Sequence, residues 1–316
     1  MASFYTMAFT ILLFHIRLHV GAAKFTFVNK CEETIWPAVL GSPRLDTTGF
    51  ELRSGASRAF QAPTGWSGRF WGRTGCNYDQ SGRGSCATGD CGSGQLECNG
   101  AGAKAATLVE FTLGSGSMDF YDVSLVDGYN LPVMVEASGG SGQCASTGCV
   151  EDINRRCPVE LRAEGGGACR SACDTFGTAE YCCKDEYASP ALCKPSAYSQ
   201  VFKGACPKSY SYAFDDATST FTCTAADYVV TFCPSLPSQK SSEPDDGAPD
   251  ETGSGGAVPE SGSGSGQEAM LADGSWLANL ATGASTRTNS IDAAARALVL
   301  LSLLVHLASG QPFRFF

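Results

Sequence analysis

Apolar and polar residues alternate along four segments of the chain, and this pattern predicts β-strands that bury one face. The segments are residues 25–29, 107–113, 121–125 and 227–232. Clusters of glycine, asparagine and serine separate them, as expected of turns. Residues 196–205 follow a proline and carry apolar residues at helical spacing, which predicts one short helix. The fold class is therefore mainly β.

Two of these strands place a carboxylate on the face that does not carry the apolar residues. Val109, Phe111 and Leu113 share one face of the second segment, so Glu110 points to the other. The same alternation in the third segment separates Asp122 from its apolar neighbours. We therefore expect Glu110 and Asp122 to lie away from the core formed by these strands.

The first 23 residues have the layout of a signal peptide. An apolar run at residues 8–14 is followed by small residues at 21–23. A buried N-terminal helix is the alternative interpretation. A signal peptide would place the domain expected at residues 24–234 in the secretory pathway, where disulfides form.

The chain after the last cysteine changes composition twice. Residues 235–283 are rich in Ser, Gly, Pro and acidic residues, which is typical of a flexible linker. The apolar run at 297–308 is shorter than the roughly 20 residues that span a bilayer. Small residues, a polar spacer and this tail match a GPI-attachment signal, with Gly283 as the attachment site and 284–316 as the propeptide. The alternative is an amphipathic tail on a soluble secreted protein.

Charge and histidine content restrict the chemistry. The 316 residues have 22 Lys and Arg against 32 Asp and Glu, a net charge of −10, which argues against a nucleic-acid partner. The three histidines, His15, His19 and His306, lie outside residues 24–233. The domain therefore has no imidazole for a catalytic triad or for catalytic zinc, and any acid-base chemistry falls to carboxylates.

Sixteen cysteines lie between Cys31 and Cys233, an even set that predicts eight disulfides in a secreted protein. Spacing alone does not give their connectivity. The stretch from Cys144 to Cys206 is so dense in cysteine that we expect a lobe held together by disulfides more than by an apolar core.

Residues 82–98, with the sequence GRGSCATGDCGSGQLEC, match the signature of the plant thaumatin-like family, also called pathogenesis-related family 5. The resemblance extends from Phe25 to Pro234 and includes residues 71–76, 121–130 and 210–215. It implies a flattened antiparallel β-sandwich with a disulfide-rich, partly helical lobe and a small disulfide-stapled loop subdomain. The resemblance also implies these disulfides: Cys31–Cys233, Cys76–Cys86, Cys91–Cys98, Cys144–Cys223, Cys149–Cys206, Cys157–Cys169, Cys173–Cys182 and Cys183–Cys193.

By the same resemblance, an arginine, a glutamate and three aspartates line a cleft between the sandwich and the lobe. At the matching positions this chain has Arg69, Glu110, Asp122, Asp127 and Asp215. Asp216 is adjacent to the last of these and is the alternative for that position. Asp127 follows Asp122 by an odd number of residues, so the turn between them must redirect it for both to reach one cleft.

Such a cleft could bind a neutral wall polysaccharide such as β-1,3-glucan, because carboxylates accept hydrogen bonds from sugar hydroxyls. It could also make the protein a weak endo-β-1,3-glucanase, with Glu110 as the acid and Asp127 as its partner. A third hypothesis is a non-catalytic protein-interaction module. Taken singly, each carboxylate is better explained as a surface charge paired with Arg69, Arg73 or Arg83, and it is the five together that favour a shared cleft.

The leading expectation is a secreted, antifungal defence-type protein that binds glucan, held at the outer face of the plasma membrane by a GPI anchor or free in the apoplast. We expect a monomer with no cofactor and no metal site. The three tryptophans of the first strands could be core residues or sugar platforms, and the core is favoured for Trp36 and Trp71 over Trp66.

Overall fold

The computed structural model describes residues 22–99 and 102–234. Most of the expected signal peptide, the linker at 235–283, the attachment site Gly283 and the propeptide at 284–316 lie outside the described residues. The first strand, β1 (Ala23–Asn29), begins one residue before the expected start of the domain. Among the helices of the described ranges, none is long and apolar enough to cross a membrane.

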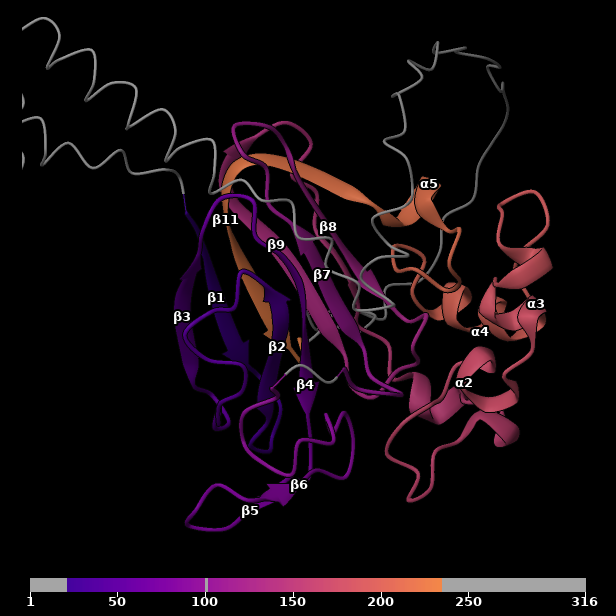
Figure 1. The fold of residues 1–316 in the computed structure, drawn as a ribbon, viewed down its shortest axis with the longest axis horizontal. Coiled ribbons are helices and arrows are strands. Elements are labelled where there is room, and N and C mark those ends of the chain that lie inside the picture. Colours follow the sequence, from indigo (N-terminus) through magenta and orange to yellow (C-terminus); the bar gives the residue numbers. More distant parts are fainter. Residues whose placement is uncertain (1–21, 100–101, 235–316) are drawn as a thin grey trace, which may run out of the picture. The chain divides into compact units, whose positions relative to one another are not determined.

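The domain is built on a curled sheet of nine strands, and a separate hairpin adds two more (Figure 1). The main sheet runs in the order β10-β9-β11-β8-β7-β4-β2, and β1 joins β11 to β3. All pairs are antiparallel except β1 with β11, which is parallel. Beyond β1, the strands are β2 (Trp36–Ser42), β3 (Ser57–Ala62), β4 (Ser67–Arg73), β5 (Asn77–Tyr78), β6 (Gly84–Ser85), β7 (Leu108–Thr112), β8 (Asp119–Ser124), β9 (Val133–Ser141), β10 (Thr147–Cys149) and β11 (Phe221–Phe232).

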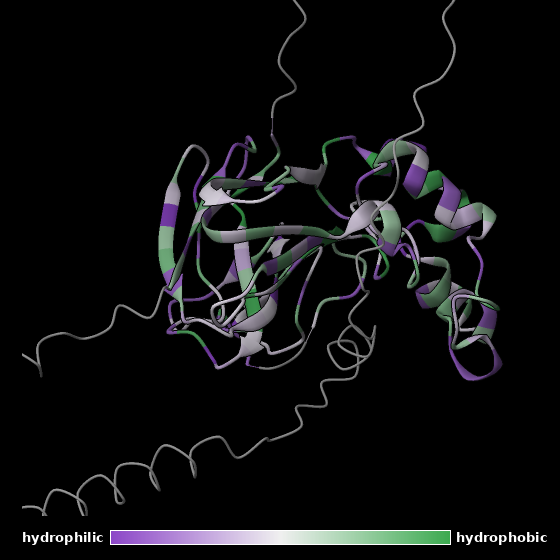
Figure 2. Cartoon of the chain, turned by 90° about the horizontal axis from the view of Figure 1, so that it is seen from above, coloured by the Kyte–Doolittle hydropathy of each residue, from purple (hydrophilic) through white to green (hydrophobic). Residues whose placement is uncertain are grey.

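The long strand β11 joins the two layers of this curled sheet. Its first residues pair with β8, and its remainder pairs with β9 and β1. Ala225, at the change of partner, has a left-handed φ of 55°, which bends the strand. The layers enclose an aromatic-rich core that includes Phe25, Phe70 and Phe111, all fully buried. Figure 2 shows the mixture of apolar and polar residues along the strands that this two-layer burial requires.

The mainly β class, the four predicted strands and the short helix are confirmed. The helix is α4 (Ala197–Ala205), and the Ser196 hydroxyl caps it by accepting a hydrogen bond from the Ser199 N–H. The remaining helices are α2 (Ala172–Phe176), α3 (Ala179–Cys182), α5 (Asp216–Ser219) and the 3-10 turns η1 (Ile153–Arg156), η2 (Val159–Leu161) and η3 (Asp185–Tyr187).

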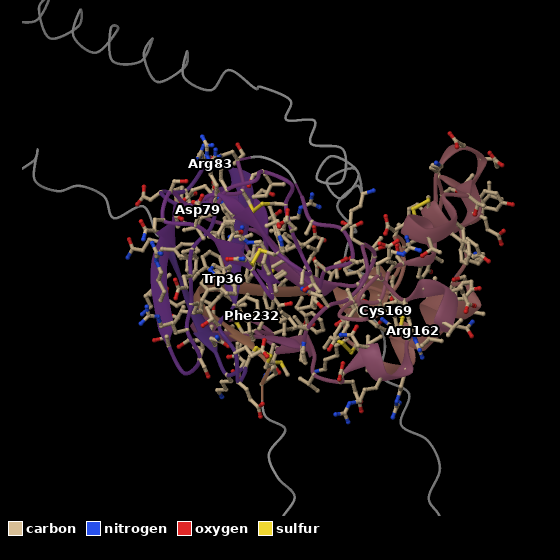
Figure 3. All side chains as sticks on the ribbon, turned by 90° about the horizontal axis from the view of Figure 1, so that it is seen from below. Trp36, Asp79, Arg83, Arg162, Cys169 and Phe232 are labelled. Carbon is tan, nitrogen blue, oxygen red and sulfur yellow. A yellow bond between two sulfur atoms is a disulfide. The ribbon has the colours of Figure 1, made fainter. Side chains whose placement is uncertain are left out.

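The lobe that carries α2, α3 and α4 has a small core of its own. That core combines four cysteines with apolar residues such as Ile153, Leu161 and Phe202. Figure 3 shows Arg162 and Cys169 in this lobe, apart from Asp79 and Arg83 of the loop subdomain. The structure has eight disulfides, and their pairing is the one that the family resemblance implies.

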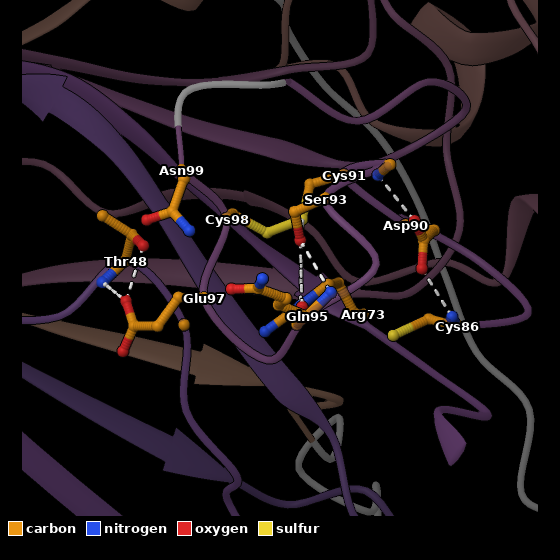
Figure 4. Close-up of a disulfide and its surroundings, with 12 residues drawn as sticks. Thr48, Arg73, Cys86, Asp90, Cys91, Ser93, Gln95, Glu97, Cys98 and Asn99 are labelled. Atoms are coloured by element: carbon orange, nitrogen blue, oxygen red, sulfur yellow. Dashed lines mark hydrogen bonds between the residues drawn. A yellow bond between two sulfur atoms is a disulfide. The ribbon is translucent and has the colours of Figure 1, made fainter. Parts of the chain in front are cut away.

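The loop subdomain contains the hairpin of β5 and β6 and two disulfides, Cys76–Cys86 and Cys91–Cys98. Arg73 lies fully buried beneath it and donates hydrogen bonds to the carbonyls of Trp36 and Leu96 and to the Tyr78 hydroxyl. Figure 4 shows Arg73 among the residues around the Cys91–Cys98 disulfide. Arg73 is therefore a structural residue, because its donors join this subdomain to β2.

Candidate functional site

Arg69, Glu110 and Asp122 form one row across three neighbouring strands. In the register of the sheet, Arg69 on β4 is paired with Glu110 on β7, and Glu110 is paired with Asp122 on β8. Paired residues of adjacent strands project to the same face, with Cβ atoms about 5 Å apart. Strand β4 and the consecutive strands β7 and β8 therefore bring one basic and two acidic side chains together.

The row lies on the face of the sheet opposite the aromatic core. The neighbours of Glu110 along β7, Val109 and Phe111, belong to that core, so Glu110 points away from it, as the alternation predicts. The row is nevertheless buried, with Glu110 only 5% exposed and Asp122 fully enclosed. The two carboxylates therefore point away from the aromatic core and are still shielded from solvent.

Asp127 reaches the row through the turn that follows β8. The Gly128 N–H donates to the Leu125 carbonyl, and Gly128 has a φ of 105°, in the region that favours glycine. A Cβ at this position would lie 2.6 Å from the carbonyl oxygen of Cys169. The turn redirects Asp127 so that its carboxylate lies 3.8 Å from the Arg69 guanidinium.

Asp215 and Asp216 have different partners. The Asp215 carboxylate accepts hydrogen bonds from the N–H and hydroxyl of Ser211 and forms an ion pair with Lys203 at 2.9 Å. Asp216 accepts a hydrogen bond from the Tyr210 hydroxyl at 2.8 Å, and its charge acts on Asp122. The alternative assignment therefore fits the geometry better, because Asp215 is turned back toward its own loop.

We call Arg69, Glu110, Asp122, Asp127 and Asp216 the acidic cluster. Burial raises the pKa of Glu110 to about 7; Arg69 opposes this rise and Asp127 adds to it. The pKa of Asp122 is raised well above its ordinary value by burial, and then by the charges of Glu110 and Asp216. Burial also raises the pKa of Asp127, with Arg69 opposing and the nearby Asp174 adding to the rise.

Asp122 is the most confined member of the cluster. Neither of its carboxyl oxygens has a hydrogen-bond partner among the described residues. An ionised carboxylate without a partner is unfavourable in a protein interior, so burial favours the protonated form of Asp122. The cluster consequently carries less negative charge than its composition suggests.

Access to the cluster is unequal. The Asp127 side chain is 46% exposed and that of Arg69 is 12% exposed, whereas Glu110 and Asp122 lie behind them. Asp127 is therefore the member best placed to accept a hydrogen bond from a ligand. Within residues 22–99 and 102–234, no group of three or more His, Cys, Asp or Glu side chains is arranged to hold a metal ion.

The sequence matches the Thaumatin family over residues 29–234. It is 63% identical over 249 residues to "Thaumatin-like protein 1" of Arabidopsis thaliana, covering 74% of this chain and 96% of that protein. The chain belongs to the thaumatin family. Thaumatin-like relatives extend to "Pathogenesis-related thaumatin-like protein 3.5" of Cryptomeria japonica, which is 54% identical over 73% of this chain and 97% of its own length. A relative from Prunus avium named "Glucan endo-1,3-beta-glucosidase" is 50% identical over 67% of this chain and 91% of its own length.

Sequence reasoning did not find two features of this thaumatin-like site. Asp174 of α2 acts on Asp127, and the Tyr210 hydroxyl holds Asp216. Asp174 belongs to the lobe, and Tyr210 forms a β-bridge with Ser124 at the end of β8. Both act across segments far apart in the sequence, so alternation along one strand does not mark their roles. Of the tryptophans, Trp71 is fully buried, as expected. The expectation is revised for the other two, because Trp66 is also fully buried and Trp36 is half-buried.

Proposed function

We propose that this thaumatin-like protein binds a neutral wall polysaccharide of the β-1,3-glucan class through its acidic cluster. The observation that carries the proposal is the Arg69–Glu110–Asp122 row, completed by the accessible carboxylate of Asp127. Asp127 accepts hydrogen bonds from sugar hydroxyls, and Arg69 donates them. Burial raises the pKa of both Glu110 and Asp122 and so favours their neutral forms, and a less charged surface suits an uncharged ligand.

The test is retention on insoluble β-1,3-glucan. Asp127→Asn keeps the shape of the side chain and removes its charge, so we expect binding to weaken about tenfold or more. Asp46→Asn is the matched control, because Asp46 is exposed and lies outside the cluster. Wild-type protein that is not retained on glucan would refute the proposal.

A weak endo-β-1,3-glucanase is the second candidate, and the pKa of Glu110 favours it. A carboxyl group with a pKa of about 7 holds a proton in weakly acidic solution and can act as a general acid, with Asp127 as nucleophile or base. Against it, a substrate oxygen would have to reach Glu110, which is only 5% exposed. Binding is therefore the better-supported function.

Reducing-end release from soluble β-1,3-glucan separates the two candidates. As an enzyme, wild type would release reducing ends and Glu110→Gln would abolish the release while retention on insoluble glucan persisted. As a binding protein, wild type would be retained without release. If wild type shows neither, the third hypothesis, a non-catalytic protein-interaction module, takes their place.

We also propose that the protein is secreted and held at the outer face of the plasma membrane by a GPI anchor at Gly283. The proposal rests on the apolar start of the sequence, the small residues at 283–285 and the apolar run at 297–308. Phosphatidylinositol-specific phospholipase should release the protein from membranes. Recovery of all the protein in the soluble extracellular fraction would contradict the anchor and leave secretion intact.

A further inference from the structure

Three aromatic side chains meet at the surface of the disulfide-rich lobe. They are Phe176 at the end of α2, Tyr181 of α3 and Tyr198 of α4, and their ring centroids lie 5.4 to 5.8 Å apart. Phe176 is 41% exposed, whereas the aromatic residues of the sheet core are buried. We call these three residues the aromatic triad. Tyr181 and Tyr198 are partly exposed beside Phe176, and rings in mutual contact at a surface can form a binding site.

The aromatic triad is held by covalent and polar links. Cys173–Cys182 joins α2 to α3 next to the first two rings, and Cys183–Cys193 closes the following loop. The Tyr198 hydroxyl donates to the Glu160 carboxylate at 2.8 Å. Rings fixed in this way lose little freedom when a ligand contacts them.

A small cavity of about 30 Å³ adjoins the aromatic triad and includes Tyr181 in its wall. Hydroxyl groups of Ser171 and Tyr212 line it, together with one acidic side chain, Glu180, and one basic side chain, Lys194. By the same measure a water molecule needs about 10–15 Å³, so the cavity has room for about two waters or one hydroxymethyl group. The opposite formal charges of its wall favour an uncharged polar group.

Two residues of the cavity wall are sequence neighbours of acidic residues at the cluster. Its wall includes Val126, which directly precedes Asp127, and Cys173, which directly precedes Asp174. Asp174 is close enough to Asp127 to act on its carboxylate. A chain-like ligand bound at Asp127 can therefore continue onto the lobe.

We propose that the aromatic triad and its cavity form a second contact site for the same neutral polysaccharide. A sugar ring would lie with its C–H face on Tyr181 or Phe176 and place a hydroxymethyl group in the cavity. Ring faces beside hydroxyl, carboxylate and ammonium groups match a pyranose, which is apolar on its faces and polar at its rim. This inference rests on the proposed function and adds selectivity for longer chains.

The test compares a β-1,3-linked trisaccharide with a β-1,3-linked heptasaccharide by titration calorimetry. Phe176→Ala and Tyr181→Ala should each weaken binding of the heptasaccharide about tenfold and leave the trisaccharide unchanged, because only the longer chain contacts both sites. Tyr181→Phe keeps the ring and should bind like wild type. Tyr187→Ala is the matched control, since Tyr187 is a half-buried tyrosine of the same lobe outside the aromatic triad and the cavity wall.

The outcomes separate the two proposals. Heptasaccharide binding that is equal in wild type and both ring-removing variants would overturn the second site while the acidic cluster stands. An equal loss in Tyr187→Ala would also overturn it, because the loss would then be general to the lobe. Wild type that binds neither oligosaccharide would overturn the proposed function and the second site together. Eight intact disulfides, checked by mass after alkylation, establish that each variant has folded.

Discussion

Replacing Glu110 by glutamine should make the stability of the domain less dependent on pH. Glu110 has a pKa of about 7 in the folded domain, chiefly because it is buried, against an ordinary 4.5 in an unfolded chain. Below pH 4.5 both states hold the proton, and the group makes no difference to folding. As the pH rises, the unfolded chain releases its proton first, so stability falls progressively between about 4.5 and about 7.

The size of this effect follows from the two pKa values. Each pKa unit between the folded and unfolded states corresponds to about 1.4 kcal/mol, so Glu110 costs the folded state about 3 kcal/mol above pH 7. Glutamine has the same shape and does not titrate, so the variant should avoid this loss. Asp122 titrates in the same direction, and its repulsion by an ionised Glu110 also disappears in the variant.

The assay is denaturant unfolding with disulfides intact, at about pH 4, 6 and 8. The free energy of unfolding of wild type minus that of Glu110→Gln should fall by about 3 kcal/mol across this range. Glu136→Gln is the matched control, because Glu136 is an exposed glutamate on β9, and its difference from wild type should stay small. A difference for Glu110→Gln that does not change with pH would refute the argument that this carboxyl is buried and protonated.

Three further predictions concern the charge of Arg69, the Cys31–Cys233 disulfide and the ion pair between Lys203 and Asp215. Arg69→Gln removes the charge that opposes the raised pKa of Glu110, so the domain should lose a further ~1 kcal/mol at pH 8 and little at pH 4, measured by the same unfolding assay. Joint replacement of Cys31 and Cys233 by serine opens a bridge between residues 202 positions apart and should cost about 5 kcal/mol, measured as a lower unfolding midpoint. Lys203→Met removes the cation paired with Asp215 and the donor to the Ser209 carbonyl, leaves Asp215 only its bonds from Ser211, and should cost about 2 kcal/mol at pH 7 in the same assay.

The sheet was predictable where one face of a strand is buried. Alternation identified β1, β7, β8 and the second part of β11, because a half-buried strand needs a period of two. It did not identify β9, whose second half is the glycine- and serine-rich exposed segment at 138–141. Alternation also did not predict that β1 pairs in parallel with β11. Pairing between the first and last strands of the domain leaves no pattern within either strand.

The sequence predicted on which face of the sheet the site residues lie, but it did not predict that they are buried. Alternation placed Glu110 and Asp122 off the core face, but their enclosure depends on residues from distant segments, such as Tyr210. The choice between Asp215 and Asp216 likewise depends on side-chain partners. One residue turns back to Lys203 and the other turns to the Tyr210 hydroxyl. Identical residue types at adjacent positions give sequence reasoning no means to separate them.

The disulfides of the domain offset the free energy that burial of the acidic cluster costs. Above pH 7, Glu110 alone offsets about 3 kcal/mol of folding free energy, a large part of the 5–15 kcal/mol that keeps a typical domain folded. The Cys31–Cys233 bridge alone contributes a comparable amount by restricting the unfolded chain. A domain closed by such bridges can therefore keep two carboxyls enclosed behind Asp127. Removing the bridge should lower the free energy of unfolding by a similar amount at every pH, so that less stability remains to offset the loss that ionisation of Glu110 brings.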